Sequence, residues 1–253
     1  MRLKVLGGFG SEGMGQRPSA FLVDDTVLVD AGTVGGGLSV PEQVALTHAL
    51  LSHAHLDHTV GLAFLSDTFA MVSPERTVTA CSIGPVVDTL RTHVFNDALW
   101  PNFTVLPPQD PVLKLEVLPE DRETRVGGLH VTPVQVDHTI PTAGFVVRDE
   151  DTGFVYSGDT GPTKRLWKVA REMRGIKALV VETAFPNRQE RLAQVSGHLT
   201  PALLQREIDK MPADVPIWIF HIKPQLYQET AEEIARLDHP RIQILEQGKT
   251  YII

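Results

Sequence analysis

The sequence has little of what disulfide-stabilised or membrane-spanning proteins need. Its 253 residues include a single cysteine, Cys81, which excludes an intrachain disulfide and a metal cage built from several thiolates. No apolar run approaches the roughly 20 residues of a transmembrane helix, and the apolar stretch at the N-terminus is too short for a secretory signal. We therefore expect a cytoplasmic protein with no membrane association, and we expect Cys81 to be a small core residue.

Basic charge is also scarce. The chain has 23 Lys and Arg residues against 31 Asp and Glu residues, a net charge of −8, so it lacks the basic surface with which proteins bind duplex nucleic acid. The 42% of hydrophobic residues is typical of a globular chain with a sizeable core. No low-complexity linker or repeat interrupts the sequence, and we expect residues 1–253 to form one domain.

The pattern of apolar residues predicts an α/β fold with two sheets covered by outer helices. Short β-type runs lie on either side of a predicted helix at 83–99, and helices then alternate with buried strands. The predicted strands are 3–6, 20–23, 27–29, 50–52, 114–118, 129–136, 144–147, 154–157, 178–181, 217–220 and 242–245, and the later predicted helices are 163–173, 201–210 and 228–238.

A glycine-rich turn follows the first predicted strand. Gly8, Gly10 and Gly13 match the pattern GxGxxG of a dinucleotide-binding turn. That pattern must open a helix, but only seven residues, including Pro18, lie between Gly13 and Phe21 of the next predicted strand. We interpret the segment as a turn that lies over the site, with backbone amides that can approach a substrate phosphate.

Histidines cluster directly after an apolar strand. The hexapeptide HAHLDH contributes His53, His55, Asp57 and His58. In an extended or looped backbone His53 and His55 point to the same side, while Asp57 and His58 can turn toward a second point a few ångströms away. One loop can therefore serve two metal ions. Imidazole and carboxylate ligands favour zinc, with manganese or iron as substitutes; a His-rich surface loop is the alternative interpretation.

Three later side chains offer the remaining ligands. A site for two metals needs about seven protein ligands. His138, Asp159 and His221 each follow a predicted apolar strand, and strand ends deliver side chains to a common crevice. We predict that these three side chains join the HAHLDH cluster.

These motifs resemble those of the metallo-β-lactamase superfamily: HAHLDH, then Ser-Gly-Asp-Thr-Gly around Asp159, then a late histidine after an apolar strand. The resemblance covers nearly the whole chain and implies a four-layer αββα sandwich with a two-metal site. It implies that one metal binds His53, His55 and His138, that the other binds Asp57, His58 and His221, and that Asp159 bridges both.

Two phosphodiesterase branches of that superfamily resemble the chain further. Ribonuclease Z has a similar motif to Ser196–Thr200 and a glutamate like Glu182, and class II cyclic-nucleotide phosphodiesterases share these and also resemble residues 30–33, 53–61 and 92–103. We favour the second branch, because the acidic net charge and the lack of a Lys/Arg-dense insertion oppose a tRNA-binding surface. A ribonuclease Z-like enzyme, another hydrolase of this fold, and a metal-binding protein without catalysis are the alternatives.

The resemblance implies hydrolysis of cAMP, cGMP or both to the nucleoside 5′-monophosphate by a hydroxide held between two zinc ions. Asp57 would also orient the nucleophile. His198 would protonate the leaving 3′ oxygen or stabilise the transition state, while Glu182 holds its other ring nitrogen. A surface histidine near a helix start is the alternative for His198.

A further group of side chains is a candidate for contact with the substrate. His93 and Asn96 share a face of the predicted helix 83–99 with Trp100, and this face either covers the nucleotide base or packs Trp100 into the core. Thr160, next to the bridging aspartate, is also expected at the substrate. The expected partner is a small cyclic nucleotide, and a homodimer is compatible with the resemblance.

Overall fold

Two seven-stranded sheets form the centre of the computed structural model, which describes residues 1–253. The first sheet has the order β14-β1-β2-β3-β4-β5-β6 and the second β13-β12-β11-β10-β9-β8-β7. The strands of the first sheet are β1 (Arg2–Gly7), β2 (Ala20–Val23), β3 (Val27–Ala31), β4 (His48–Leu50), β5 (Val78–Ser82), β6 (Leu113–Val117) and β14 (Thr250–Ile252). Those of the second are β7 (Thr124–Val126), β8 (Leu129–Gln135), β9 (Ala143–Arg148), β10 (Gly153–Tyr156), β11 (Ile176–Glu182), β12 (Ile217–Phe220) and β13 (Ile242–Ile244).

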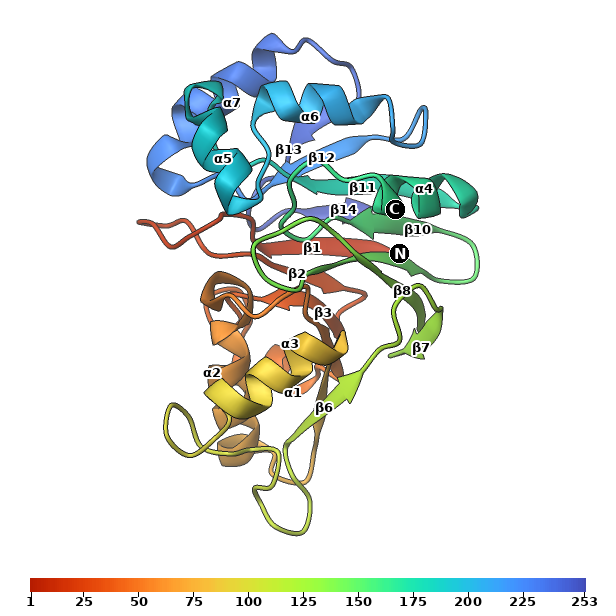
Figure 1. Cartoon of the computed structure of the whole chain (residues 1–253). Helices are drawn as coiled ribbons and strands as arrows, with labels where there is room; N and C mark the ends of the chain where they lie inside the picture. Colours follow the sequence, from red (N-terminus) through yellow and green to blue (C-terminus); the bar gives the residue numbers. More distant parts are fainter.

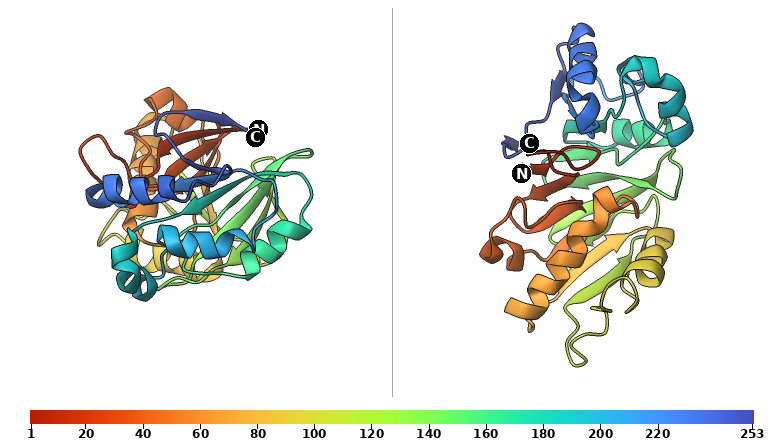
Figure 2. Two further views of the ribbon diagram at one scale, coloured as in Figure 1. Left: turned by 90° about the horizontal axis from the view of Figure 1, so that it is seen from above. Right: turned by 90° about the vertical axis from the view of Figure 1, so that its left-hand side faces the viewer.

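The helices lie on the outer faces of the two sheets (Figure 1). Helices α1 (Val40–Val44), α2 (Leu56–Val72) and α3 (Gly84–Thr89) accompany the first sheet, and α4 (Arg165–Glu172), α5 (Glu190–Ser196), α6 (Pro201–Ile208) and α7 (Tyr227–Arg236) accompany the second. A π-helix, Leu90–Val94, and two short 3₁₀ turns, Asn187–Gln189 and Pro224–Leu226, complete the chain. The two ends meet because β1 pairs with β14, as Figure 2 also shows. None of the helices combines the length and the hydropathy of a transmembrane segment.

Alternating side chains of the second sheet fill two separate cores. On β12, Trp218 and Phe220 face the first sheet, whereas Ile217 and Ile219 face the outer helices. Across the sandwich, the ring of Phe21 on β2 packs edge-on against Phe220 with centroids 5.4 Å apart. Because both faces are covered, these strands read as continuous apolar runs. The predicted αββα sandwich is confirmed.

The two sheets repeat one pattern, in which three antiparallel strand pairs are followed by three parallel pairs. In the second sheet β8, β10 and β12 all run in the same direction, because β9 is antiparallel to both β8 and β10 and β12 is parallel to β10 by way of β11. Their carboxyl ends therefore meet at one edge of the sheet. That edge carries the site described below.

The predicted helix at 83–99 is wrong over its last five residues. Helical structure ends at Val94, and the following residues form a loop held by local side-chain bonds. The Asn96 Oδ1 accepts hydrogen bonds from the N–H groups of Ala98 and Leu99, at 3.0 and 2.9 Å. Such local acceptors compete with helical hydrogen bonds. His93 and Asn96 therefore do not share a helix face with Trp100.

Helix α2 was not predicted, although it begins inside the HAHLDH motif. Its apolar residues are distributed around the whole helix: Leu62 is buried, while Leu56 and Phe64 are 62% and 57% exposed. A helix without an apolar stripe has no 3.6-residue signal. The motif is thus a loop for its first half and a helical turn for its second.

Candidate metal centre

The first four candidate ligands surround the start of α2. His53 follows β4 in an extended loop, and His55 is the N-cap of α2 with φ −63° and ψ 147°. Asp57 and His58 occupy the first helical turn, where the N–H of His58 bonds to the carbonyl of His55 at 3.0 Å. The change from extended to helical backbone points these side chains toward two adjacent positions, as the spacing predicts.

The remaining three candidate ligands come from the second sheet. His138 and Asp159 each lie three residues beyond the ends of β8 and β10, and His221 lies one residue beyond the end of β12. His221 adopts φ +70°, which is rare for a residue with a side chain, and its N–H bonds to the carbonyl of Gly8 at 2.7 Å. The structure brings all seven side chains together.

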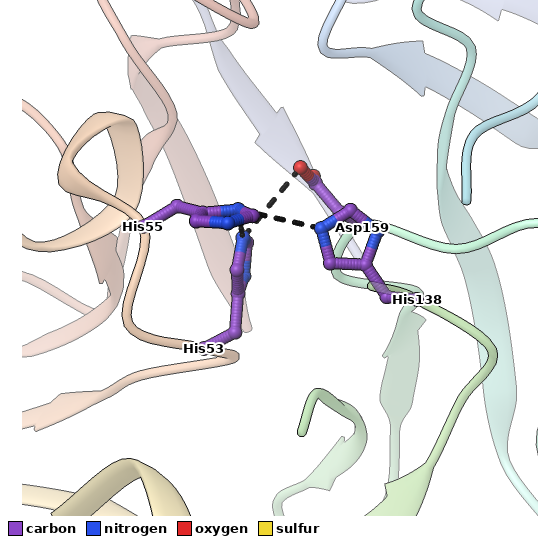
Figure 3. Close-up of side chains that lie close together, drawn as sticks. All are labelled: His53, His55, His138 and Asp159. Atoms are coloured by element: carbon purple, nitrogen blue, oxygen red, sulfur yellow. Dashed lines mark hydrogen bonds and ion pairs between the residues drawn. The ribbon is translucent and has the colours of Figure 1, made fainter. Parts of the chain in front are cut away.

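One group contains His53, His55, His138 and Asp159, shown in Figure 3. The Nε2 of His53 lies 2.9 Å from Nδ1 of His55, and Nδ1 of His55 lies 3.3 Å from Nε2 of His138. The Asp159 Oδ2 is 3.7 Å from Nε2 of His53. A tetrahedral zinc ion with bonds of about 2.0–2.1 Å holds its ligands about 3.3 Å apart, so these atoms fit one.

The second group contains Asp57, His58 and His221, and Asp159 joins it to the first. The Nε2 atoms of His58 and His221 are 3.1 Å apart. Asp159 places Oδ1 3.2 Å from His58 Nε2 and Oδ2 3.1 Å from His221 Nε2, while Asp57 Oδ2 is 3.5 Å from His221 Nε2. Both carboxylate oxygens of Asp159 therefore face histidine nitrogens, as a bridging ligand must.

Outer hydrogen bonds orient the histidine rings. The Nδ1 of His53 is 2.9 Å from Ser52 Oγ, that of His58 is 2.6 Å from Asp30 Oδ2, and that of His138 is 2.9 Å from the Gly197 carbonyl. The Asp30 carboxylate and the Gly197 carbonyl can only accept, and the Ser52 hydroxyl already donates to Asp30 at 2.8 Å, so all three Nδ1 atoms are donors. Their Nε2 atoms are left free for a cation.

Asp30, on β3, is the buried centre of this outer layer. It accepts hydrogen bonds from the Ser52 N–H at 2.7 Å and the Tyr156 hydroxyl at 2.6 Å, besides those of the Ser52 hydroxyl and His58. The sequence singled out Asp30 only within a motif, without this role. A buried aspartate at the end of an apolar strand was the one available signal.

The electrostatics of the cluster favour bound positive charge. Burial lowers the pKa of His58, but the carboxylates of Asp159 and Asp30 raise it well above its ordinary value. Burial lowers the pKa of His221 to about 3, so that ring is a neutral ligand. The buried Asp159 Oδ1 has no hydrogen-bond partner, and a buried carboxylate oxygen without one is costly unless a cation binds it. The donor set therefore fits divalent metal.

His198 and Glu182 form a buried pair beside the two groups. The Nδ1 of His198 is 2.7 Å from Glu182 Oε1, and the ring of His198 stacks on His221 with centroids 5.3 Å apart. Glu182 also accepts from the N–H groups of Thr160 and Leu199, at 3.0 and 3.3 Å. Burial lowers the pKa of His198, but the Glu182 carboxylate raises it above its ordinary value.

The glycine-rich turn lies directly against the centre. The carbonyl of Gly8 binds the N–H of His221, and the N–H of Gly10 binds the carbonyl of Ile222 at 3.2 Å. A Cβ atom on Gly10 would lie 2.7 Å from both Nδ1 and Cε1 of the His221 ring. The turn is a wall of the site, as interpreted, and it opens no helix.

The side chains expected at the substrate lie in different surroundings. His93 and Asn96 are exposed, and Trp100 packs edge-on against Phe64 of α2 with centroids 5.5 Å apart. Thr160 is fully buried, and its hydroxyl donates to the carbonyl of Gly161 at 2.8 Å. In this structure Thr160 supports Glu182. Cys81 is a buried core residue, as predicted.

Comparison with known families agrees with this geometry. The family described as "Beta-lactamase superfamily domain" matches residues 26–222, a range that includes every candidate ligand. The chain belongs to the metallo-β-lactamase superfamily. Its membership confirms the resemblance drawn from the motifs.

The curated relatives that the chain matches are named for the same activity. A "Probable 3′,5′-cyclic-nucleotide phosphodiesterase" of Yersinia pestis is 29% identical over 70% of this chain and 57% of the relative. The "3′,5′-cyclic-nucleotide phosphodiesterase" of Schizosaccharomyces pombe is 26% identical over 63% of this chain and 49% of the relative. The matches thus span about half the length of these relatives.

A solved structure shares the fold over nearly the full length of both chains. The crystal structure of unliganded yeast PDE1 superimposes with a TM-score of 0.83 and 20% identity, over 98% of each chain. At that identity the likeness shows the metallo-β-lactamase fold alone. The candidate ligands and the fold together indicate a divalent metal centre.

Proposed function

We propose that the protein hydrolyses 3′,5′-cyclic nucleotides to nucleoside 5′-monophosphates in a site that holds two zinc ions. The observation that carries the proposal is the pair of ligand groups joined by Asp159, in a chain whose curated relatives are named for this activity. Six further ligands complete the two groups: His53, His55 and His138 in one, and Asp57, His58 and His221 in the other. Manganese or iron fit the same donor set.

The bound ions would neutralise charge on the phosphoryl oxygens and provide a nucleophile at neutral pH. Asp57, half-buried at the start of α2, lies at the accessible side of the cluster, where it can accept a hydrogen bond from the attacking water. The fully buried ligands His53, His58 and His221 close the opposite side. The substrate therefore approaches from the side of Asp57, His55 and His138.

His198 would give a proton to the leaving 3′ oxygen. Its Nδ1 is held by Glu182, so Nε2 is the atom available to the substrate. Glu182 fixes the ring orientation, and the N–H groups of Thr160 and Leu199 in turn fix Glu182. A buried acceptor that fixes the orientation of the ring supports a role for His198 as a general acid.

A small substrate suits the charge of the protein better than RNA does. The net charge of −8 opposes the many phosphate contacts that supply nucleic-acid affinity, whereas one cyclic phosphate needs little more than the cations. Organisation of residues 1–253 as one domain, a cytoplasmic location and a homodimer stay predictions.

The proposal is tested by substrate comparison on the zinc-loaded protein. We would incubate it with cAMP, cGMP, bis(p-nitrophenyl) phosphate and a short RNA, resolve the products by chromatography, and measure bound zinc by mass spectrometry. Asp159→Ala is the inactive control, because it removes the bridging ligand from both groups.

We expect release of 5′-AMP or 5′-GMP, about two zinc ions per chain, and loss of both in the Asp159→Ala variant. Cleavage of only the generic diester or the RNA would reject cyclic nucleotides as substrates and leave the metal centre standing. Full activity of the Asp159→Ala variant would reject the metal centre.

A further inference from the structure

A groove of about 540 Å³ opens beside the metal centre. The glycine-rich turn forms one wall, the start of α2 forms the second, and Lys223, two residues beyond the ligand His221, closes the third. This volume lies within the range of about 300–1,000 Å³ that is typical of small-molecule sites. The groove reaches the candidate ligands at Asp57, on the accessible side of the cluster.

Lys223 is the only cationic side chain that lines this groove. Its ammonium group donates a hydrogen bond to the carbonyl of Gly10 and lies 3.7 Å from Asp57 Oδ2. An ammonium group has three donors, and the distance to Asp57 is too long for a hydrogen bond. Two donors therefore remain, on a side chain that is 22% exposed.

The backbone holds Lys223 in place. Its N–H bonds to the carbonyl of Ala184 at 3.2 Å, and its carbonyl accepts from the N–H of Leu226 at 2.9 Å. The groove thus presents a fixed cation next to the candidate metal ligands, which suits an anionic group.

We propose that Lys223 binds a non-bridging oxygen of the substrate phosphate, and that the nucleoside lies in the groove over Leu56 and Val60. This inference rests on the proposed function and deepens it. Asp57 and the exposed Glu12 are the acidic side chains of the groove. When Asp57 binds a metal ion, the positive charge of Lys223 is left to interact with the phosphate.

The product monophosphate carries more negative charge than the cyclic diester, so the cation contributes more to product binding than to substrate binding.

The test titrates the zinc-loaded protein with inorganic phosphate in a calorimeter, which needs no turnover. Lys223→Met removes the charge and Lys223→Arg retains it. Lys114→Met is the matched control, because Lys114 lies on the edge strand β6 in an ion pair with Glu116 at 2.9 Å. Zinc content and melting temperature are measured for every variant. Inhibition by 5′-AMP is compared with KM for the cyclic nucleotide.

We expect Lys223→Met to bind phosphate about tenfold to hundredfold more weakly, the range for loss of one charge-assisted hydrogen bond. Its zinc content should stay unchanged, Lys223→Arg should recover most of the affinity, and Lys114→Met should match the wild type. The inhibition constant of 5′-AMP should rise more than KM does.

Unchanged phosphate affinity in zinc-loaded Lys223→Met would overturn the inference. Loss of zinc from that variant would overturn it as well, because Lys223 would then act through Asp57 and not on the ligand. Failure of the proposed function has a different signature. In that case the wild type would bind phosphate through Lys223 but leave cyclic nucleotides intact.

Discussion

Gly10 offers a test of whether the glycine-rich turn sets the geometry of the metal centre. In Gly10→Ala the added Cβ would lie 2.7 Å from Nδ1 and Cε1 of His221 and 2.5 Å from its carbonyl oxygen. Carbon atoms in ordinary contact are about 3.5 Å apart or more, so the ring must move by about 0.8 Å. Metal ligands have to stay within about 0.5 Å of their working positions.

We therefore expect Gly10→Ala to weaken zinc binding about tenfold to hundredfold and to cost about 1–3 kcal/mol of the free energy of unfolding. Competition with a chromophoric chelator measures the affinity, and thermal unfolding measures the stability. Gly8→Ala is the matched control in the same turn, because its Cβ would meet only Val5 Cγ1, at 3.5 Å.

Wild-type zinc affinity in Gly10→Ala would refute the idea that the turn fixes His221. An equal loss in both variants would refute it in another way, since the effect would then come from any added methyl group in the turn.

Three further predictions concern other parts of the chain. His198→Ala should lower kcat about 10²–10⁴-fold with zinc content unchanged, and loss of zinc would make His198 a ligand. Glu182→Gln should lower kcat in the same direction, since it perturbs the ring of His198; unchanged kcat would contradict this. Cys81 should resist a thiol reagent at pH 8 until the protein unfolds, because burial raises its pKa to about 12. Rapid labelling of the folded protein would contradict the burial. Because the folded state keeps the thiol proton to a higher pH than the unfolded state does, the contribution of Cys81 to the free energy of unfolding is full below pH 9 and is lost as the pH rises toward 12.

Buried strands were the part of the fold that the sequence predicted best. The predicted strands 20–23 and 217–220 match β2 and β12 residue for residue, because short apolar runs between turn residues have few alternative structures. Helix α2 was missed because its apolar residues are distributed around the whole helix and form no stripe. The predicted helix at 83–99 is too long because the Asn96 side chain accepts hydrogen bonds from the loop that follows it. The spacing of apolar residues gives no sign of such bonds.

The candidate ligands could be predicted from the sequence where unusual residue types lie close together along the chain. HAHLDH is conspicuous because three histidines and an aspartate in six residues have no ordinary packing role. Asp30, Ser52 and the Gly197 carbonyl could not be assigned in the same way. They act through hydrogen bonds to His53, His58 and His138, and such bonds depend on how the two sheets pack.

Both ligand groups draw side chains from both halves of the sandwich, so metal binding and stability are coupled. His53 and His55 follow a strand of the first sheet, whereas His138 and Asp159 follow strands of the second. The hydrogen bonds around the ligands also join the two sheets, since the hydroxyl of Tyr156 on β10 donates to Asp30 on β3. A bound ion adds RT ln(1 + [M]/Kd) to the free energy of unfolding, and its removal leaves the buried Asp159 Oδ1 without a partner. Substitution of a ligand therefore changes activity and stability together. Variants outside the ligand set, such as those at Lys223 or His198, are the ones that can separate substrate chemistry from the integrity of the fold.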